Sequence, residues 1–156
     1  METTKAMQVE QEEYIEATPE QVWQVMASVE GIQQWLGPNQ YEARVGAAVR
    51  FDVNHDGQQF IMTGEVTRCD PPHTLAFTWT EQEVGQAPWP VATLVTLTLT
   101  PEGSGTRVRL VHSGFERLPG AQQQYEGYVQ GWAVRPVLQG LKRLVEHGRE
   151  SCRAVP

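Results

Sequence analysis

Residues 131–148, GWAVRPVLQGLKRLVEHG, carry the helical pattern on which the fold prediction depends. Its apolar residues recur at the three- and four-residue spacing of one buried helical face: Val134, Val137, Leu138, Leu141, Leu144 and Val145. A helix over 122–147 would be roughly 39 Å long at the usual rise per residue, which is enough to cross a sheet. Pro136 interrupts the pattern, and a kink is expected there because the carbonyl of Trp132 loses its hydrogen-bond donor.

Three aromatic residues precede this proline, namely Tyr125, Tyr128 and Trp132. On an ideal helix they lie opposite the stripe that contains Leu141. Either the helix changes phase near Pro136, or the aromatic residues cover a second surface. A break here would serve as a hinge beside a pocket or would only bend the helix around a sheet, and the pattern leaves both interpretations open.

From Tyr41 to Phe115 the hydrophobic period changes from that of a helix to two. Threonines and arginines alternate with apolar residues, which form three inward-facing sets: Val49, Phe51 and Val53; Leu75, Phe77 and Trp79; Val108, Leu110 and His112. This alternation predicts an antiparallel sheet with one solvated face. Within it, Gly64 is expected to mark a β-bulge.

The region before this sheet predicts one strand and two short helices. A charged edge strand is expected over 8–17. Thr18 then has the properties of an N-cap, with Pro19 at the first helical position and Gln21 at capping-box spacing. Gly31 is expected to interrupt this helix before a second short one. One α+β domain over 1–156 follows, in which a curved antiparallel sheet of six or seven strands holds the long C-terminal helix across its concave face.

Composition excludes several classes of partner. A net charge of −7 argues against nucleic acid, because phosphate binding needs a concentrated basic surface. No apolar run approaches the about 18 residues of a membrane span, and the first residues have no signal-peptide pattern. Cys69 and Cys152 are isolated thiols, which suits a reducing cytoplasm. Because no His, Cys or carboxylate pair has ligand spacing, we expect neither a metal nor another cofactor.

Four segments together resemble a known superfamily: IEATPEQVWQVMASVEGIQQWL (15–36), GEVTRCDPPHTLAFTW (64–79), TRVRLVHSGF (106–115) and the C-terminal stretch quoted above. In this order and spacing they are similar to the START-like (SRPBCC, helix-grip) superfamily. Within it they resemble bacterial proteins similar to the C-terminal domain of the activator of heat-shock protein 90 ATPase. The resemblance implies a helix-grip fold, whose members bind lipids and small molecules, act as cyclases or serve as partner modules. A chaperone partner and a homodimer are therefore both open.

The leading functional prediction is a binding protein for a small apolar or aromatic molecule. A curved sheet and one helix cannot close tightly everywhere, so an apolar cavity is expected between them. The candidate lining residues are Trp35, Phe51, Phe60, Met62, Leu75, Phe77, Trp79, Val95, Leu97, His112, Phe115, Trp132 and Leu138. His112 would be one of few polar anchors, although a buried histidine is more often a satisfied core group. Trp89, in a proline-bounded loop, is a candidate flap over the mouth.

Catalytic machinery is not identified by the sequence. Glu65 falls in a strand in the middle of the sheet, and Glu13 shares the expected inner face of the first strand with Ile15. A carboxylate pair could do acid–base chemistry there, but exposure at the rim or a charge on an edge strand is the simpler interpretation. No nucleophile elbow, phosphate loop or paired-cysteine motif occurs. A chaperone-associated module is therefore the second hypothesis, and a polyketide cyclase-like enzyme is the third.

Overall fold

The computed structural model describes residues 7–154, with side chains as far as residue 148. The first six residues and the side chain of Cys152 lie outside this description. The elements are β1 (Gln8–Ile15), α1 (Pro19–Met26), α2 (Val29–Trp35), β2 (Ala48–His55), β3 (Gln58–Asp70), β4 (Thr74–Glu83), β5 (Thr93–Glu102), β6 (Gly105–Ser113), the 3₁₀ turn η1 (Phe115–Arg117), α3 (Ala121–Val134) and α4 (Val137–Ala154). The expected α+β architecture is confirmed.

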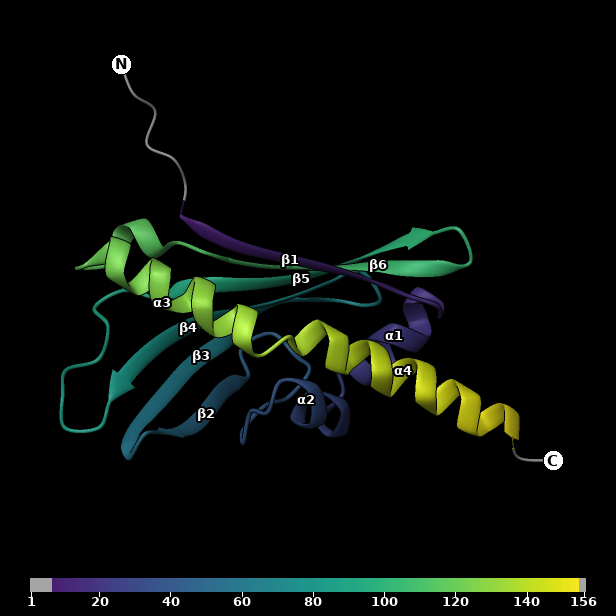
Figure 1. The fold of residues 1–156 in the computed structure, drawn as a ribbon, viewed down its shortest axis with the longest axis horizontal. Coiled ribbons are helices and arrows are strands. Elements are labelled where there is room, and N and C mark those ends of the chain that lie inside the picture. Colours follow the sequence, from purple (N-terminus) through teal and green to yellow (C-terminus); the bar gives the residue numbers. More distant parts are fainter. Residues whose placement is uncertain (1–6, 155–156) are drawn as a thin grey trace, which may run out of the picture.

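The strands form one six-stranded antiparallel sheet in the order β1-β6-β5-β4-β3-β2. The first strand thus pairs with the last, and β2 forms the opposite edge. Figure 1 shows the sheet curving beneath the two C-terminal helices, which follow one another across it. α4 contacts β1, α1 and α2, while α1 also contacts β5 and β6. The described helices include none long and apolar enough to cross a membrane.

The two short helices begin with side-chain caps. Thr18 and Gln21 form the predicted capping box of α1. The break between α1 and α2 falls at Ala27 and Ser28, where Ser28 caps α2 by accepting a 3.0 Å hydrogen bond from the Gly31 amide. The expectation that Gly31 interrupts the helix is therefore wrong. Gly31 lies inside α2, and a Cβ there would stand 1.7 Å from the Val25 carbonyl oxygen, so glycine permits the close approach of α1.

Gly64 has a similar role in the sheet. The irregular register between β3 and β4 lies between Val66 and Arg68, so the prediction of a bulge at Gly64 is wrong. A Cβ at position 64 would stand 1.7 Å from the carbonyl oxygen of Thr78 on β4. The glycine is needed because the two backbones approach closely at this point.

The C-terminal helical layer is divided by Pro136. α3 ends at Val134 and α4 begins at Val137, while Arg135 between them is non-helical, with φ −111° and ψ 89°. The expected kink is thus a complete break, so 122–147 is not one continuous helix. The carbonyl of Trp132, which has no helical donor, accepts a 2.9 Å hydrogen bond from Gln11 Nε2 on β1. A side chain from the sheet therefore supplies the hydrogen bond that the Trp132 carbonyl loses at the helix break.

The change of direction at this break explains the two apolar faces of the C-terminal region. Trp132 in α3 and Leu141 in α4 are both buried. The helix therefore changes phase near Pro136, and the aromatic residues of α3 do not cover a separate surface. The inward-facing strand residues Leu75, Phe77, Val95, Leu97, Val108 and Leu110 are fully buried beneath this layer, as the alternation predicts.

Candidate functional site

A cluster of aromatic rings lies between the sheet and α3. Trp79 on β4 is at its centre, with its ring centroid 4.9 Å from Phe51 on β2 and 5.5 Å from His112 on β6. From the helix, Tyr128 and Trp132 approach within 6.1 Å of the same indole. Residues from three strands and one helix therefore meet at a single side chain, and the pairs are tilted or edge-on, as aromatic rings prefer.

His112 supports this cluster from behind. It is fully buried, and its Nδ1 accepts a 3.2 Å hydrogen bond from the indole N–H of Trp132. Nε2 must then carry the proton, which it donates over 2.7 Å to Thr93 Oγ1, while the Thr93 hydroxyl donates to the Trp79 carbonyl. Burial lowers the pKa of His112 to about 3. His112 is therefore neutral with both nitrogens engaged, and it positions Trp132.

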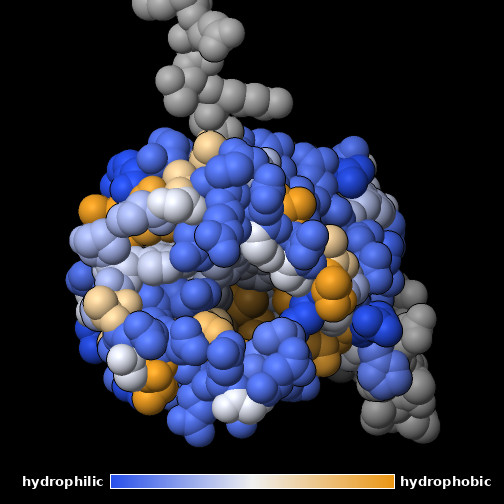
Figure 2. All heavy atoms as spheres, turned by 60° about the vertical axis from the view of Figure 1, so that its left-hand side comes forward, coloured by the Kyte–Doolittle hydropathy of each residue, from blue (hydrophilic) through white to orange (hydrophobic). Residues whose placement is uncertain are grey.

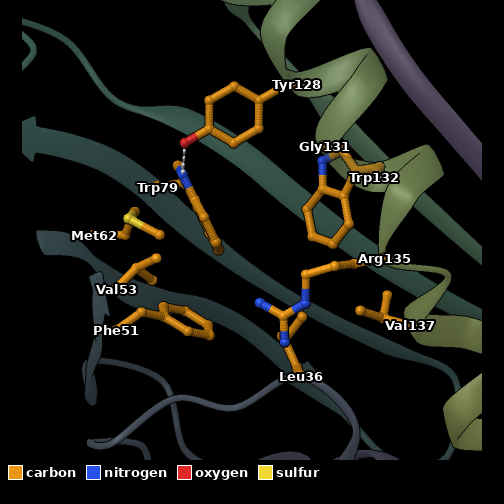
Figure 3. A pocket seen from close by; sticks show the side chains of 10 residues that line it. All are labelled: Leu36, Phe51, Val53, Met62, Trp79, Tyr128, Gly131, Trp132, Arg135 and Val137. Carbon is orange, nitrogen blue, oxygen red and sulfur yellow. Dashed lines mark hydrogen bonds between the residues drawn. The ribbon is translucent and has the colours of Figure 1, made fainter. Parts of the chain in front are cut away.

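Tyr128 holds the second indole. Its hydroxyl accepts a 2.8 Å hydrogen bond from Trp79 Nε1 and donates a 2.7 Å bond to Glu81 Oε1. Burial, followed by the negative charge of Glu81, raises the pKa of Tyr128 well above its ordinary value, so the hydroxyl keeps its proton at neutral pH. Figure 3 shows the bond between Tyr128 and Trp79 at the upper edge of the site. Both indoles at the site are thus fixed by hydrogen bonds.

An apolar cavity of about 170 Å³ lies in front of these two indoles. Its walls come from β2, β3 and β4, from the end of α2, and from the junction of α3 with α4 (Figure 3). The lining residues are Leu36, Phe51, Val53, Met62, Trp79, Tyr128, Gly131, Trp132, Arg135 and Val137. Figure 2 shows a hollow with hydrophobic atoms at its floor and a hydrophilic rim. The site is an open apolar pocket with a phenol and a guanidinium as its polar side chains.

Four of the residues predicted to line a pocket do so: Phe51, Met62, Trp79 and Trp132. His112 lies one layer behind them. A further five, Leu75, Phe77, Val95, Leu97 and Phe115, are fully buried in the core and do not reach the cavity. Alternation identifies the face of a strand but not the distance of each residue from the helix layer. The deep residues therefore share the pattern of the lining ones without sharing their place.

The remaining predicted residues lie elsewhere. Trp35 is buried at the end of α2, where its indole N–H donates a 3.0 Å hydrogen bond to the Met26 carbonyl. Phe60 is half-buried near the β2–β3 hairpin, and Leu138 is buried at the start of α4, beside β1 and away from the cavity. Trp89 packs on Tyr128 and Phe115 but does not line the cavity. None of these four contributes a wall.

Six of the lining residues were not predicted from the sequence: Leu36, Val53, Tyr128, Gly131, Arg135 and Val137. Val53 carried a usable signal, since it belongs to the inward-facing set of Phe51. Tyr128 also did, because it lies one helical turn before Trp132. The positions of Arg135 and Val137 depend on the direction that the chain takes after the helix break. The direction of the chain after the break cannot be predicted from the spacing of residues along the sequence.

The carboxylates considered for acid–base chemistry do not form a pair. Glu65 is exposed, whereas Glu13 is half-buried and forms a 3.5 Å ion pair with Lys142 of α4. Neither lines the cavity. No three His, Cys, Asp or Glu side chains of the described region gather in a group that could hold a metal ion. The main feature of the cavity is its aromatic wall.

The comparisons with known proteins identify the family. The family model described as activator of Hsp90 ATPase homolog 1-like protein matches residues 16–146 of the sequence. Protein MLL2253 from Mesorhizobium loti is 30% identical with a TM-score of 0.70, over 90% of this chain and 97% of its own. The Aha1 dimer from Colwellia psychrerythraea is 24% identical with a TM-score of 0.61, over 89% of this chain and 96% of its own.

A third similar structure is DynU16, from the dynemicin biosynthetic locus. It is 25% identical with a TM-score of 0.66, over 90% of this chain and 48% of its own. No curated protein matches the chain. Because the family model spans most of the sequence and the matched structures share its helix-and-sheet architecture, this START-like chain belongs to the activator of Hsp90 ATPase homolog 1-like family.

Proposed function

We propose that the protein binds a small apolar or aromatic molecule in the cavity beneath the α3–α4 junction. The observation that carries this proposal is the pair of indoles, Trp79 and Trp132, which form one wall of an open apolar cavity. Ligand sites are typically concave and apolar, with a few placed polar groups. In a close-packed core, other side chains would fill the space beside these two tryptophans.

The way in which the two indoles are held supports the same proposal. The N–H of Trp79 is engaged by Tyr128, and the N–H of Trp132 by His112. These bonds fix the orientation of both rings before any ligand arrives, which lowers the entropic cost of binding. Both indole N–H groups are already hydrogen-bonded within the protein, so the ring carbons are the part of each indole that is left to contact a ligand.

The volume of the cavity suits a molecule of one or two rings. For scale, an engineered apolar cavity of about 150 Å³ in another protein binds benzene. The cavity here is slightly larger, at about 170 Å³, and it opens to solvent. A fused pair of rings could enter with one substituent left at the mouth. DynU16 belongs to a biosynthetic locus, and this also favours a small organic molecule.

Two glycines of α3 provide a matched test. Gly131 lines the cavity, whereas Gly127 lies one turn earlier on the same helix and outside it, and a Cβ would meet nothing within 4 Å at either position. The neutral probe 2-naphthalenemethanol should bind the unmodified protein saturably at one site, with a dissociation constant in the micromolar range by calorimetry. Gly131→Leu should weaken binding at least tenfold by occupying the cavity, and Gly127→Leu should change it less than twofold.

Two results would count against this proposal. The first is an absence of saturable heat with the unmodified protein. The second is an equal effect of the two leucine substitutions, which would place the binding site away from the cavity. Native mass spectrometry of protein purified from its own cells adds an independent observation, since a ligand of the expected class would appear as a small adduct.

Family membership favours one further candidate, a role beside a chaperone. The family model is described by activation of the Hsp90 ATPase, and the Colwellia psychrerythraea structure is described as a dimer. For this chain, both a chaperone partner and a homodimer are proposals. An affinity-tagged protein that recovers a chaperone in stoichiometric amount would favour this role. If Gly131→Leu left that recovery unchanged, the chaperone role would be independent of the cavity.

A further inference from the structure

We propose that the ligand of this cavity is an aromatic carboxylate, with its rings against Trp79 and Trp132 and its carboxylate on Arg135. This inference rests on the proposed binding function and adds the chemical class of the ligand. It follows from the position and the charge of Arg135, and from the lack of a counter-ion for it among the described residues.

Arg135 stands where the two C-terminal helices separate. It is the C-cap residue of α3, and its backbone N–H bonds to the Gly131 carbonyl over 3.1 Å. This fixes the backbone from which the side chain extends. Figure 3 shows the Arg135 side chain reaching into the space between Trp132 and Leu36, with its guanidinium at the cavity. The helix break therefore brings a cation to the open side of an apolar pocket.

The guanidinium has no counter-ion within the described part of the chain. Arg50, Arg107 and Arg109 on the sheet each pair with a carboxylate. Arg135 makes neither a side-chain hydrogen bond nor an ion pair with any described residue, although it is the only charged residue among those that line the cavity. Glu81, the acid that contacts the aromatic cluster, accepts a hydrogen bond from Tyr128. A permanent positive charge thus faces the cavity with its five donors available.

A carboxylate is the group that fits such a donor set. The planar guanidinium binds it through two parallel N–H···O bonds, and charge-assisted bonds of this kind are stronger than neutral ones. The apolar walls strengthen the attraction because they keep water from one side of the pair. The rings would remain on the indole wall, where edge and tilted contacts are favourable. One molecule would then satisfy both the apolar and the charged parts of the site.

A neutral aromatic ligand is the alternative, with the guanidinium stacked on its ring by a cation–π interaction. The two possibilities differ in whether a carboxylate on the ligand increases its affinity. Calorimetry with 2-naphthoate and 2-naphthalenemethanol compares ligands with the same ring system and a different head group. Arg135→Gln removes the charge, Arg135→Lys keeps it without the planar fork, and Arg143→Gln removes an exposed arginine of α4 as a control.

We expect the unmodified protein to bind 2-naphthoate at least tenfold more tightly than 2-naphthalenemethanol. Arg135→Gln should abolish most of this preference while changing the affinity for the neutral probe less than threefold. Arg135→Lys should retain part of the preference, and Arg143→Gln should retain all of it. Each variant should keep the far-ultraviolet circular dichroism of the unmodified protein, since the Arg135 side chain makes no hydrogen bond or ion pair with any described residue.

Equal affinities for the two probes in the unmodified protein would overturn the carboxylate assignment and leave the binding function in place. An equal loss for both probes in Arg135→Gln would also overturn it, because the arginine would then act on the ring. If neither probe binds saturably, the binding function itself fails. The three results are distinguishable within one set of titrations.

Discussion

At the scale of single residues, the polar groups of the cluster act by holding rings in place. His112 accepts from the Trp132 indole and donates to Thr93, so it offers no proton and no lone pair to a ligand. Tyr128 is similarly occupied between Trp79 and Glu81. The sequence indicated that His112 faces inward, and this is confirmed by its complete burial. Its partners could not be predicted, because they come from β5 and α3.

The buried state of His112 makes stability depend on pH. Its pKa is about 3 in the folded protein and near 6.5 in an unfolded chain, because burial disfavours the charged form. Below pH 6.5 the unfolded chain takes up a proton that the folded chain refuses, so the free energy of unfolding falls as the pH falls. Between pH 7 and pH 4.5 the loss should be about 2–3 kcal/mol, measured by urea unfolding at each pH.

His112→Gln provides the comparison for this pH effect. A glutamine amide can keep hydrogen bonds in this place but does not titrate, so the variant should lose most of the dependence in this window. Glu10 and Asp52 have pKa values lowered by hydrogen bonds from Arg109 and Arg50 respectively, and they contribute mainly at lower pH. Parallel curves for the two proteins would show that His112 is not the group responsible.

At the scale of secondary-structure elements, the division of the C-terminal helix is the decisive feature. Pro136 removes a donor, Gln11 replaces it from β1, and the two helices then pack with different faces on the sheet and on α1 and α2. The sequence predicted the kink from the missing donor. It could not predict that a side chain from the first strand would stabilise a complete break, since Gln11 and Trp132 are far apart in the chain.

Leu141 anchors the second of these helices. Its side chain is fully buried, so truncation in Leu141→Ala should leave a cavity and lower the free energy of unfolding by about 2–5 kcal/mol. Val134 at the end of α3 is 80% exposed, and Val134→Ala should change the free energy of unfolding by less than about 0.5 kcal/mol. Urea denaturation measures both changes. A loss in Leu141→Ala as small as that of the control would contradict the packing of α4.

Two glycines should respond to alanine in opposite directions. Gly64→Ala would place a Cβ 1.7 Å from the Thr78 carbonyl oxygen, so β3 and β4 must separate and we expect a loss of more than about 2 kcal/mol. Gly140 lies inside α4, where a Cβ would meet nothing within 4 Å. Gly140→Ala should therefore add about 0.5–1 kcal/mol through helix propensity. Thermal unfolding of the two variants tests this, and a stable Gly64→Ala protein would contradict the close strand approach.

At the scale of the whole molecule, the order of elements and the facing of the strands follow from local patterns. The capping box at Thr18 and the alternation through Leu75, Phe77 and Trp79 each depend on neighbours in sequence, and each is confirmed. The cavity depends instead on how far the helical layer stands from the sheet. Local patterns do not give that distance, because the chain changes direction at Arg135, between α3 and α4. For this reason the sequence predicted the aromatic wall better than the open side.

Binding of a small aromatic molecule in front of Trp79 and Trp132 can be observed directly at the indole N–H groups. The ¹⁵N-labelled protein has five tryptophan indole N–H signals, and each reports on its own site. Trp23 on α1 and Trp35, whose N–H donates to the Met26 carbonyl, do not line the cavity and serve as internal controls. Addition of 2-naphthalenemethanol should shift the Trp79 and Trp132 signals along one saturable curve and leave those of Trp23 and Trp35 unchanged. Equal, unsaturable shifts of all five signals, or shifts that spare Trp79 and Trp132, would contradict binding at this site.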